Sequence, residues 1–222
     1  IINLPAGGNP LISNIRFMNF TAQAGALDDA IIADNQITCA YGNGPIGAIA
    51  RTIDGIWIFG AADGWQVSGN IINYANPVAG PPNEIVNSVG ISMQLVTGTR
   101  NIIGPNNNTT SILFPLSSQR DSWLRCGIHI DGSPTVAVCK NDANNIRHDY
   151  HFMNNCPAIE FGRNIIRNAH FGLEIWGPVP NNHDYRMNEW LPSSPYTSKS
   201  AEITAPPLIV NGGQSAWNWR VD

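Results

Sequence analysis

The sequence predicts an all-β protein in which short parallel strands stack into a solenoid. Apolar and polar residues alternate with a period of two in short runs, and Gly, Asn or Pro ends each run. Asparagine is frequent, at 27 of 222 residues, and lysine occurs only twice. Charged residues make up 13% of the chain, against roughly 25% in an average globular domain. A composition this poor in charge argues against a coiled coil or a helical bundle.

A short phrase that begins with glycine recurs along the chain. It reads Gly-Ile-Trp-Ile-Phe from Gly55, and related phrases begin at Gly90, Gly127 and Gly172. Strand alternation places the second and fourth residues of each phrase on one face and the third and fifth on the other. We therefore expect eight apolar side chains inside the solenoid: Ile56, Ile58, Ile91, Met93, Ile128, Ile130, Leu173 and Ile175.

A second phrase places asparagine at the ends of strands. It occurs at residues 68–73, 99–103 and 162–168. Asparagine tolerates the left-handed conformation of sharp turns, and stacked asparagines can form a hydrogen-bonded ladder. We expect strands of about five residues, three to a coil of roughly 20 to 25 residues. The glycine phrases are 35, 37 and 45 residues apart, so loops such as 74–87 and 106–121 project, or a further coil intervenes.

These phrases resemble the right-handed parallel β-helix superfamily. The resemblance rests on residues 55–60 and on the run from Trp65 to Asn73, and it covers about residues 50–190. Four further segments resemble β-helix segments of large secreted proteins of Bacteroidota-type bacteria: residues 138–142, 153–164, 170–175 and 186–190. The resemblance implies the architecture, whereas the superfamily includes lyases, hydrolases, phage tailspikes, adhesins and passive fibres.

The domain organisation follows from a change in composition near residue 190. We expect a right-handed parallel β-helix with projecting loops over residues 1–190. Residues 191–222 are rich in proline, which predicts an extended C-terminal strap. Trp217 and Trp219 are expected to pack on the side of the solenoid or to cover an open end.

The outer residues of the glycine phrases form the candidate binding face. If the strands stack in one sheet, Trp57, Phe59, Gln94 and Trp176 share this face with acidic residues. Aromatic rings stack on the apolar faces of sugars, and carboxylates bind their hydroxyl groups. The pattern predicts a carbohydrate-binding surface.

An acid pair on the same face supports an enzymatic alternative. Asp131 and Glu174 are 43 residues apart, which is near two coils and gives a separation of roughly 9.6 Å. That distance is at the edge of the range of about 6.5–9.5 Å for inverting glycosidases. In an enzyme these two residues are the acid–base candidates, and His129 or Arg163 assists. The other interpretation is that they are ordinary outer residues, because many acid pairs on a solenoid have this spacing.

The segment His148-Asp-Tyr-His151 does not predict a metal site. Positions 148 and 151 of a regular strand face opposite ways, and the glutamate of a zinc-protease motif is missing. We expect hydrogen-bonded imidazoles here, and neither a metal nor a cofactor in the protein.

The cysteines contain no Cys-x-x-Cys pair, which argues against a zinc ribbon or a redox motif. Buried thiols, one disulfide and, least favoured, a catalytic thiol remain open. The four residues are Cys39, Cys126, Cys139 and Cys156.

Charge and hydropathy restrict the partners. The net charge of −4 offers no basic surface for nucleic acid. No apolar run approaches the roughly 18 residues of a membrane-spanning helix, so we expect no membrane insertion. The chain begins without methionine or a leader, which favours a mature or excised segment of a longer protein. Abundant Asn, Gly, Ser and Thr favour an extracellular location.

The leading functional expectation is non-enzymatic. It is an extracellular structural or adhesive module of a bacterial surface or matrix protein, with polysaccharide or neighbouring subunits as partners. The alternatives are a polysaccharide-degrading hydrolase or lyase, and a segment of a phage tailspike. Open solenoid ends favour association, so we expect an assembly or a longer chain, with a self-capped monomer as the alternative.

Overall fold

The computed structural model describes most of the strand-forming part of the chain. The described residues are 2–3, 11–19, 29–40, 52–60, 63–75, 87–98, 100–111, 126–133, 135–144, 146, 148–154, 156, 160–167, 169, 171–176, 187–191 and 199–203. All regular structure among them is β-strand. None of these residues belongs to a helix long and apolar enough to cross a membrane.

The strands form three parallel sheets, which we name A, B and C. Sheet A contains β1 (Ile2–Asn3), β4 (Gln36–Ala40), β7 (Ile71–Ala75), β10 (Asn108–Ser111), β13 (Asp142–Asn144), β16 (Ile165–Arg167) and β18 (Glu189–Leu191). Sheet B contains β2 (Leu11–Asn19), β5 (Thr52–Gly60), β8 (Asn87–Gln94), β11 (Cys126–Asp131), β14 (His148–Met153), β17 (Phe171–Trp176) and β19 (Lys199–Ile203). Sheet C contains β3 (Ile31–Ala33), β6 (Gln66–Ser68), β9 (Asn101–Ile103), β12 (Val136–Cys139) and β15 (Glu160–Gly162).

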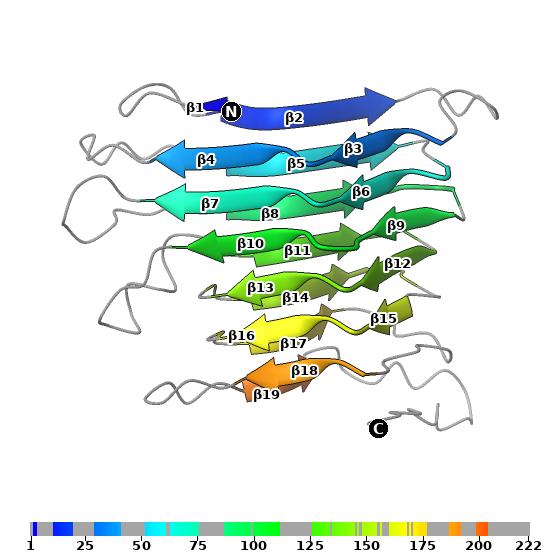
Figure 1. The fold of residues 1–222 in the computed structure, drawn as a ribbon. Helices are drawn as coiled ribbons and strands as arrows, with labels where there is room; N and C mark the ends of the chain where they lie inside the picture. The colour runs from blue at the N-terminus through cyan, green and yellow to red at the C-terminus, as the bar shows by residue number, and fades with distance from the viewer. Residues whose placement is uncertain are drawn as a thin grey trace.

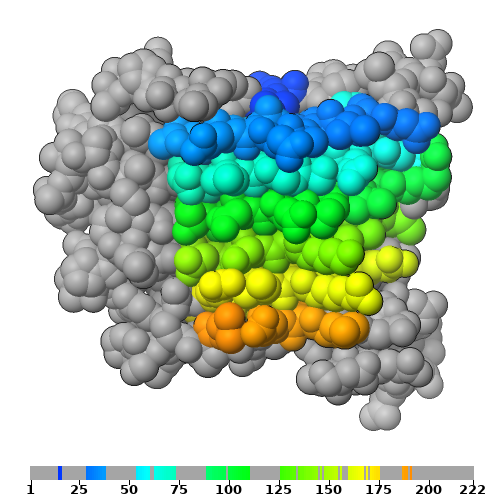
Figure 2. All heavy atoms as spheres, viewed as in Figure 1, coloured from blue at the N-terminus to red at the C-terminus, as the bar shows by residue number. Residues whose placement is uncertain are grey.

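The chain visits the sheets in a repeating order. From β2 to β16 each strand of sheet B is followed by one of sheet C and then one of sheet A. Each strand pairs in parallel with the strand one coil before it, as β5 does with β2 and β8 does with β5. Figure 1 shows the result as a stack of coils, and Figure 2 shows the same coils as adjacent bands of atoms. The all-β prediction is confirmed, and the stacked parallel sheets are consistent with a β-helix.

The structure explains the longest interval between glycine phrases and corrects one expected loop. The interval of 45 residues contains an extra coil, because β14 pairs with both β11 and β17 and places Asp149 where the other coils have glycine. The loop expected to project at 106–121 is partly wrong, because residues 108–111 form strand β10 of sheet A. Asn108, Thr109 and Thr110 pair with strands on both sides, and Ser111 pairs with β7, so these residues do not project. The expected loop at 74–87 falls largely on residues outside the described part.

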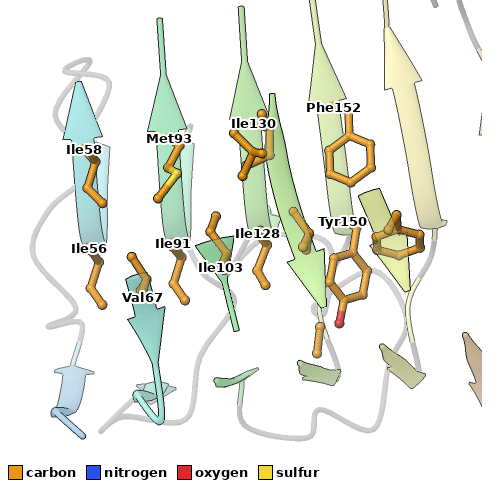
Figure 3. Packing of buried hydrophobic residues seen from close by; sticks show 14 of the residues in the cluster. Ile56, Ile58, Val67, Ile91, Met93, Ile103, Ile128, Ile130, Tyr150 and Phe152 are labelled. Carbon is orange, nitrogen blue, oxygen red and sulfur yellow. The ribbon is translucent and has the colours of Figure 1, made fainter. Parts of the chain in front are cut away.

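The predicted core is confirmed. All eight apolar residues expected inside the solenoid have relative exposures of 5% or less. Sheet A contributes Ile72 to the same cluster. Sheet C contributes Val67 and Ile103 (Figure 3). The aromatic ring of Phe161 packs edge-on against Tyr150 at a centroid distance of 4.8 Å. The core therefore stacks aliphatic side chains along β5, β8 and β11, is aromatic in the coil of β14 and β15, and is aliphatic again at Leu173 and Ile175 of β17.

An asparagine ladder runs along the corner between sheets C and A. Each side-chain amide nitrogen donates to the side-chain oxygen of the next asparagine, over distances of 2.8–3.1 Å. The amide nitrogens also donate to backbone carbonyls, as Asn107 does to Val67 at 2.7 Å. The ladder predicted from the strand-ending asparagines is thus present in the structure. It consists of Asn35, Asn70, Asn107, Asn141, Asn164 and Asn188.

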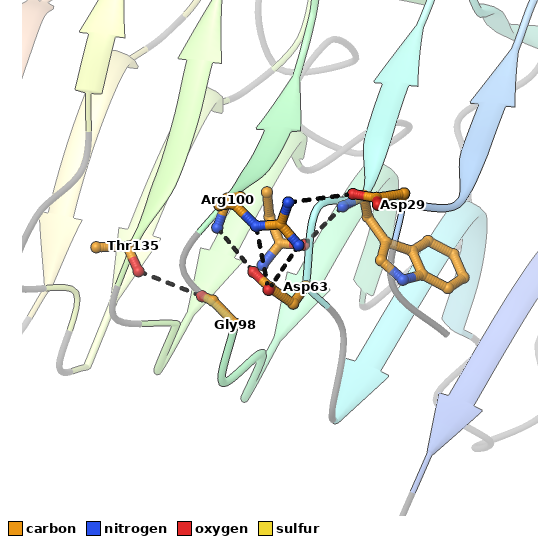
Figure 4. Close-up of polar contacts among 7 residues, drawn as sticks. Asp29, Asp63, Gly98, Arg100 and Thr135 are labelled. Carbon is orange, nitrogen blue, oxygen red and sulfur yellow. Dashed lines mark hydrogen bonds and ion pairs between the residues drawn. The ribbon is translucent and has the colours of Figure 1, made fainter. Parts of the chain in front are cut away.

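A second set of contacts links the coils on the surface near sheet C. The Arg100 guanidinium lies 3.0 Å from an Asp63 carboxylate oxygen and 3.4 Å from one of Asp29. Figure 4 shows Arg100 between these two acids, and the Thr135 hydroxyl donating to the Gly98 carbonyl. Exposed ion pairs of this kind contribute about 0–1 kcal/mol each. The stack therefore depends on its core and its buried asparagines more than on these charges.

The last described strand bears on the boundary expected at residue 190. Strand β18 crosses that boundary, and β19 lies within residues 191–222 and pairs in parallel with β17. Part of the segment expected to be a strap therefore adds a strand to sheet B. Trp217 and Trp219 lie outside the described residues.

Candidate functional site

Sheet B carries the candidate site on its outer face. The pairing register aligns one row of outward residues across five coils: Trp57, Ser92, His129, His151 and Glu174. It aligns a second row two residues further along each strand: Phe59, Gln94, Asp131, Met153 and Trp176. The residues selected from the sequence for this face therefore belong to two neighbouring rows.

A break in the strand alternation adds a third outward row. A Cβ atom placed on Gly90 or Gly127 would meet the side chain of Thr109, which is fully buried, so the glycine position faces inward. The next residue, Ile91 or Ile128, is also in the core. Because two consecutive residues face inward, the residue before each glycine faces outward. This row contains Asp54, Val89, Cys126, His148 and Phe171.

The alternation break brings His148 and His151 to the same face. Their ring centroids lie 5.4 Å apart, so the prediction that they point in opposite directions is wrong. The reason is Asp149, which takes the glycine position. Its side chain is fully buried and accepts a hydrogen bond from the backbone nitrogen of Arg167 in sheet A.

Five side chains from three adjacent coils meet at this place, and we call them the Cys–His–Glu cluster. Ligand atoms of Cys126, His129 and His151 all lie within 4.8 Å of one another. The rings of His129 and His151 have centroids 5.0 Å apart. Glu174 Oε2 lies against His148 Nδ1 and 3.8 Å from His151 Nε2. The cluster consists of Cys126, His129, His148, His151 and Glu174.

The cluster is nearly closed to solvent. Relative exposures are 3% for Cys126 and Glu174, 5% for His148 and 8% for His129. A buried carboxylate is costly unless cations or hydrogen-bond donors surround it. Glu174 has two imidazoles beside it, and each forms an ion pair with it when protonated. The cluster can therefore hold a proton or a metal ion between nitrogen, sulfur and oxygen donors.

The structure separates the two proposed acid–base residues. Asp131 is half-buried in the second row and accepts a hydrogen bond from the Asn154 side chain. Glu174 lies in the first row, two coils away and two residues back along the strand. Strand geometry puts their Cα atoms roughly 12 Å apart. His129 shares the cluster with Glu174, whereas Arg163 is exposed in the turn after β15.

The residues predicted to bind carbohydrate lie on strands β5, β8 and β17 of this face. Trp57 and Phe59 are half-buried and meet edge-on at a centroid distance of 5.8 Å. The Arg16 guanidinium lies 4.3 Å from the centre of the Trp57 ring. Gln94 is half-buried in the adjacent coil. The Trp176 backbone is in register with Met153, and its side chain is outside the described residues.

The described cysteines are free thiols. Cys126 and Cys156 are buried, and Cys139 is half-buried. Burial raises the pKa of Cys156 to about 11 and also raises that of Cys139, so both are protonated at neutral pH. A protonated thiol is a weak nucleophile. The side chain of Cys39 is outside the described residues.

The spacing of cysteine and histidine in the sequence contains a signal for the Cys–His–Glu cluster that regular strand alternation conceals. Cys126 and His129 are three residues apart, as are His148 and His151, and the second pair follows the first by 22 residues. That interval is one coil of the predicted length, so the two pairs stack. Comparison of the chain with protein-family models, with curated proteins and with solved structures found no match.

Asp54 gives the outer face a pH-dependent effect on stability. Burial raises its pKa from 3.8 to about 6, against the opposing effect of Arg16. Because the folded-state pKa is raised, the contribution of Asp54 to the free energy of unfolding is most favourable below pH 4. This contribution falls as the pH rises to about 6. The shift corresponds to about 3 kcal/mol. We expect Asp54→Asn to remove this fall.

Urea denaturation at several pH values from 3.5 to 7 measures the effect. This range includes the roughly two pH units over which Asp54 titrates. As the pH rises, the free energy of unfolding of Asp54→Asn should become larger relative to that of the wild type. Parallel curves for the two proteins would contradict the assignment.

Proposed function

We propose that the chain forms a right-handed parallel β-helix that serves as an extracellular structural or adhesive module of a bacterial surface or matrix protein. The repeated passage from sheet B to C to A supports a continuous solenoid. Right-handedness is the strong preference of parallel crossover connections. A stiff stack with stacked isoleucines and a continuous asparagine ladder suits a load-bearing or spacing role.

The carbohydrate-binding part of the proposal rests on one observation. Phe59, Gln94 and Asp131 of the second row lie partly exposed on three consecutive coils of one face, with the partly exposed Trp57 beside Phe59. Adjacent strands are about 4.8 Å apart, so the row extends in the direction in which a polysaccharide chain could lie. Ring stacking from the aromatic pair and hydrogen bonds from the amide and carboxylate provide the two contacts that sugars require. Polysaccharide is thus the proposed partner, and neighbouring subunits are the second.

A glycan array combined with a reducing-sugar assay on the same sample tests the proposal. We expect binding to a polysaccharide without release of reducing ends. Trp57→Ala should weaken binding about tenfold, because one ring-stacking contact contributes about 1.4 kcal/mol. The matched control is Ile102→Ala, which removes an exposed apolar side chain from sheet C. No binding to any glycan, or equal loss in both variants, would contradict the proposed surface.

Release of reducing ends would instead favour the enzymatic alternative. Two features weigh against it. Asp131 and Glu174 lie in different rows, and Glu174 is buried against two imidazoles. If sugar is nevertheless cleaved and Asp131→Asn abolishes cleavage, the non-enzymatic proposal is wrong.

A further inference from the structure

We propose that the Cys–His–Glu cluster binds one divalent transition-metal ion of the zinc class and that this ion fastens three coils together. Cys126, His129 and His151 are the first three ligands, and Glu174 is the fourth. The inference concerns the buried part of the outer face of sheet B and is independent of carbohydrate binding.

The distances between donor atoms fit a site that closes slightly on the ion. Zinc–nitrogen and zinc–sulfur bonds of about 2.0–2.3 Å place tetrahedral ligand atoms roughly 3.3–3.8 Å apart. The donor atoms of Cys126, His129 and His151 lie within 4.8 Å of one another, so a contraction of about 1 Å completes the geometry. Glu174 lies outside this group of three, and its Oε2, which is 3.8 Å from His151 Nε2, would move toward Cys126 and His129 to become the fourth ligand. All four residues sit on paired strands of sheet B, so the contraction would come from rotation of their side chains.

The donor set determines the class of ion. A thiolate and two imidazoles favour zinc, copper or nickel over calcium and magnesium, which prefer oxygen ligands. The thiolate of Cys126 and the carboxylate of Glu174 together carry two negative charges, which a divalent ion neutralises. A neutral centre avoids the large cost of uncompensated charge on two residues that are each only 3% exposed.

His148 is the outer partner of the proposed centre. Its Nδ1 lies against Glu174 Oε2, in the position of the second-layer groups that orient metal-binding carboxylates. Its Nε2 is buried and has no hydrogen-bond partner among the described residues. Such a nitrogen is costly in a purely structural cluster, so it supports a site built around a polar ligand.

The ion would add metal–ligand bonds between three strands that already pair in parallel in sheet B. Cys126 and His129 come from β11, His151 from β14 and Glu174 from β17. A four-ligand site shielded from solvent is typical of structural zinc. The rival interpretation is a packed polar cluster in which the Cys126 thiol stays protonated and donates to the Ile128 carbonyl, as it does over 3.3 Å here.

Metal binding by the full chain distinguishes the two. After dialysis against a chelator, the protein is titrated with Co²⁺ and, separately, with Zn²⁺. We expect one ion per chain, a near-ultraviolet charge-transfer band from a cobalt–thiolate bond, displacement of Co²⁺ by Zn²⁺ and a zinc-dependent rise in melting temperature. Cys126→Ser and His151→Gln should each lower zinc affinity at least about 100-fold, and His148→Gln about 10-fold. Cys139→Ser, which removes a thiol from sheet C, is the matched control.

Each outcome decides the proposal. Loss of the charge-transfer band in Cys126→Ser but not in Cys139→Ser supports it, provided that circular dichroism shows both variants folded. If Cys126→Ser fails to fold, the band and stoichiometry of His151→Gln decide in its place. Absence of stoichiometric binding, or a band that survives in Cys126→Ser, would overturn the proposal. Neither result bears on glycan binding, so the two proposals can fail separately.

Discussion

Replacing Asn141 with alanine is expected to lower the free energy of unfolding by about 3 kcal/mol or more. The Asn141 side chain is buried and donates to the Ile103 carbonyl at 2.9 Å and to Asn164 Oδ1 at 3.1 Å. It also accepts a hydrogen bond from Asn107 Nδ2 at 2.9 Å. Alanine would leave the Ile103 carbonyl and one amide hydrogen of Asn107 without these partners, at about 1–3 kcal/mol each before any relaxation, whereas Asn164 Oδ1 still accepts from the backbone nitrogen of residue 141.

Asn108→Ala is the matched control, because Asn108 is a half-buried strand residue beside the ladder. Urea denaturation of both variants measures the difference in unfolding free energy. We expect the control to change it by less than about 1 kcal/mol. Equal and small effects at both positions would show that the ladder does not hold the coils together.

Replacing Gly90 with valine is expected to destabilise the protein by more than about 3 kcal/mol. A Cβ atom at this position would lie 2.6 Å from the backbone oxygen of Gly127 and 2.7 Å from the Thr109 side chain. Overpacking alone costs about 1–3 kcal/mol, and here the nearest atom is backbone that cannot rotate away. The neighbouring strand would have to move.

Thermal and urea unfolding of a size series measure this effect. Gly90→Ala should be destabilised less than Gly90→Val, whereas Ala137→Val on the half-buried face of sheet C should change stability little. A Gly90→Val protein as stable as the wild type would mean that Gly90 does not face inward. It would also undermine the alternation break that turns Cys126 and His148 outward.

The period-two pattern was sufficient to predict the strands and the buried core, and the strand-ending asparagines predicted the ladder at the corner between sheets C and A. Ile91 and Ile128 could be placed inside because alternation depends only on neighbours in the chain. The ladder could be predicted because asparagine is among the few residues suited to both the turn and the stacked hydrogen bonds. A further coil was one of the two explanations left open for the spacing, but strand β14 could not be recognised in it, because Asp149 stands where the recurring phrase has glycine.

The candidate site was only partly predictable from sequence. Outward direction is a local property, so His129 and Glu174 were assigned to the correct face. Burial depends on the rest of the molecule, and Glu174, expected on an open surface, is almost fully covered. The meeting of His148 with His151 depended on a break in the alternation at the glycine position. The Cβ contacts at Gly90 and Gly127 reveal that break only in three dimensions.

A crystal structure of the 222-residue chain would show directly whether its strands stack in parallel sheets. We expect parallel strands about 4.8 Å apart, with Ile56, Ile91, Ile128, Tyr150 and Leu173 stacked in one buried column and Cys126, His129 and His151 together on the opposite face of the same sheet. Antiparallel pairing of these strands, or a solvent-exposed column, would contradict it.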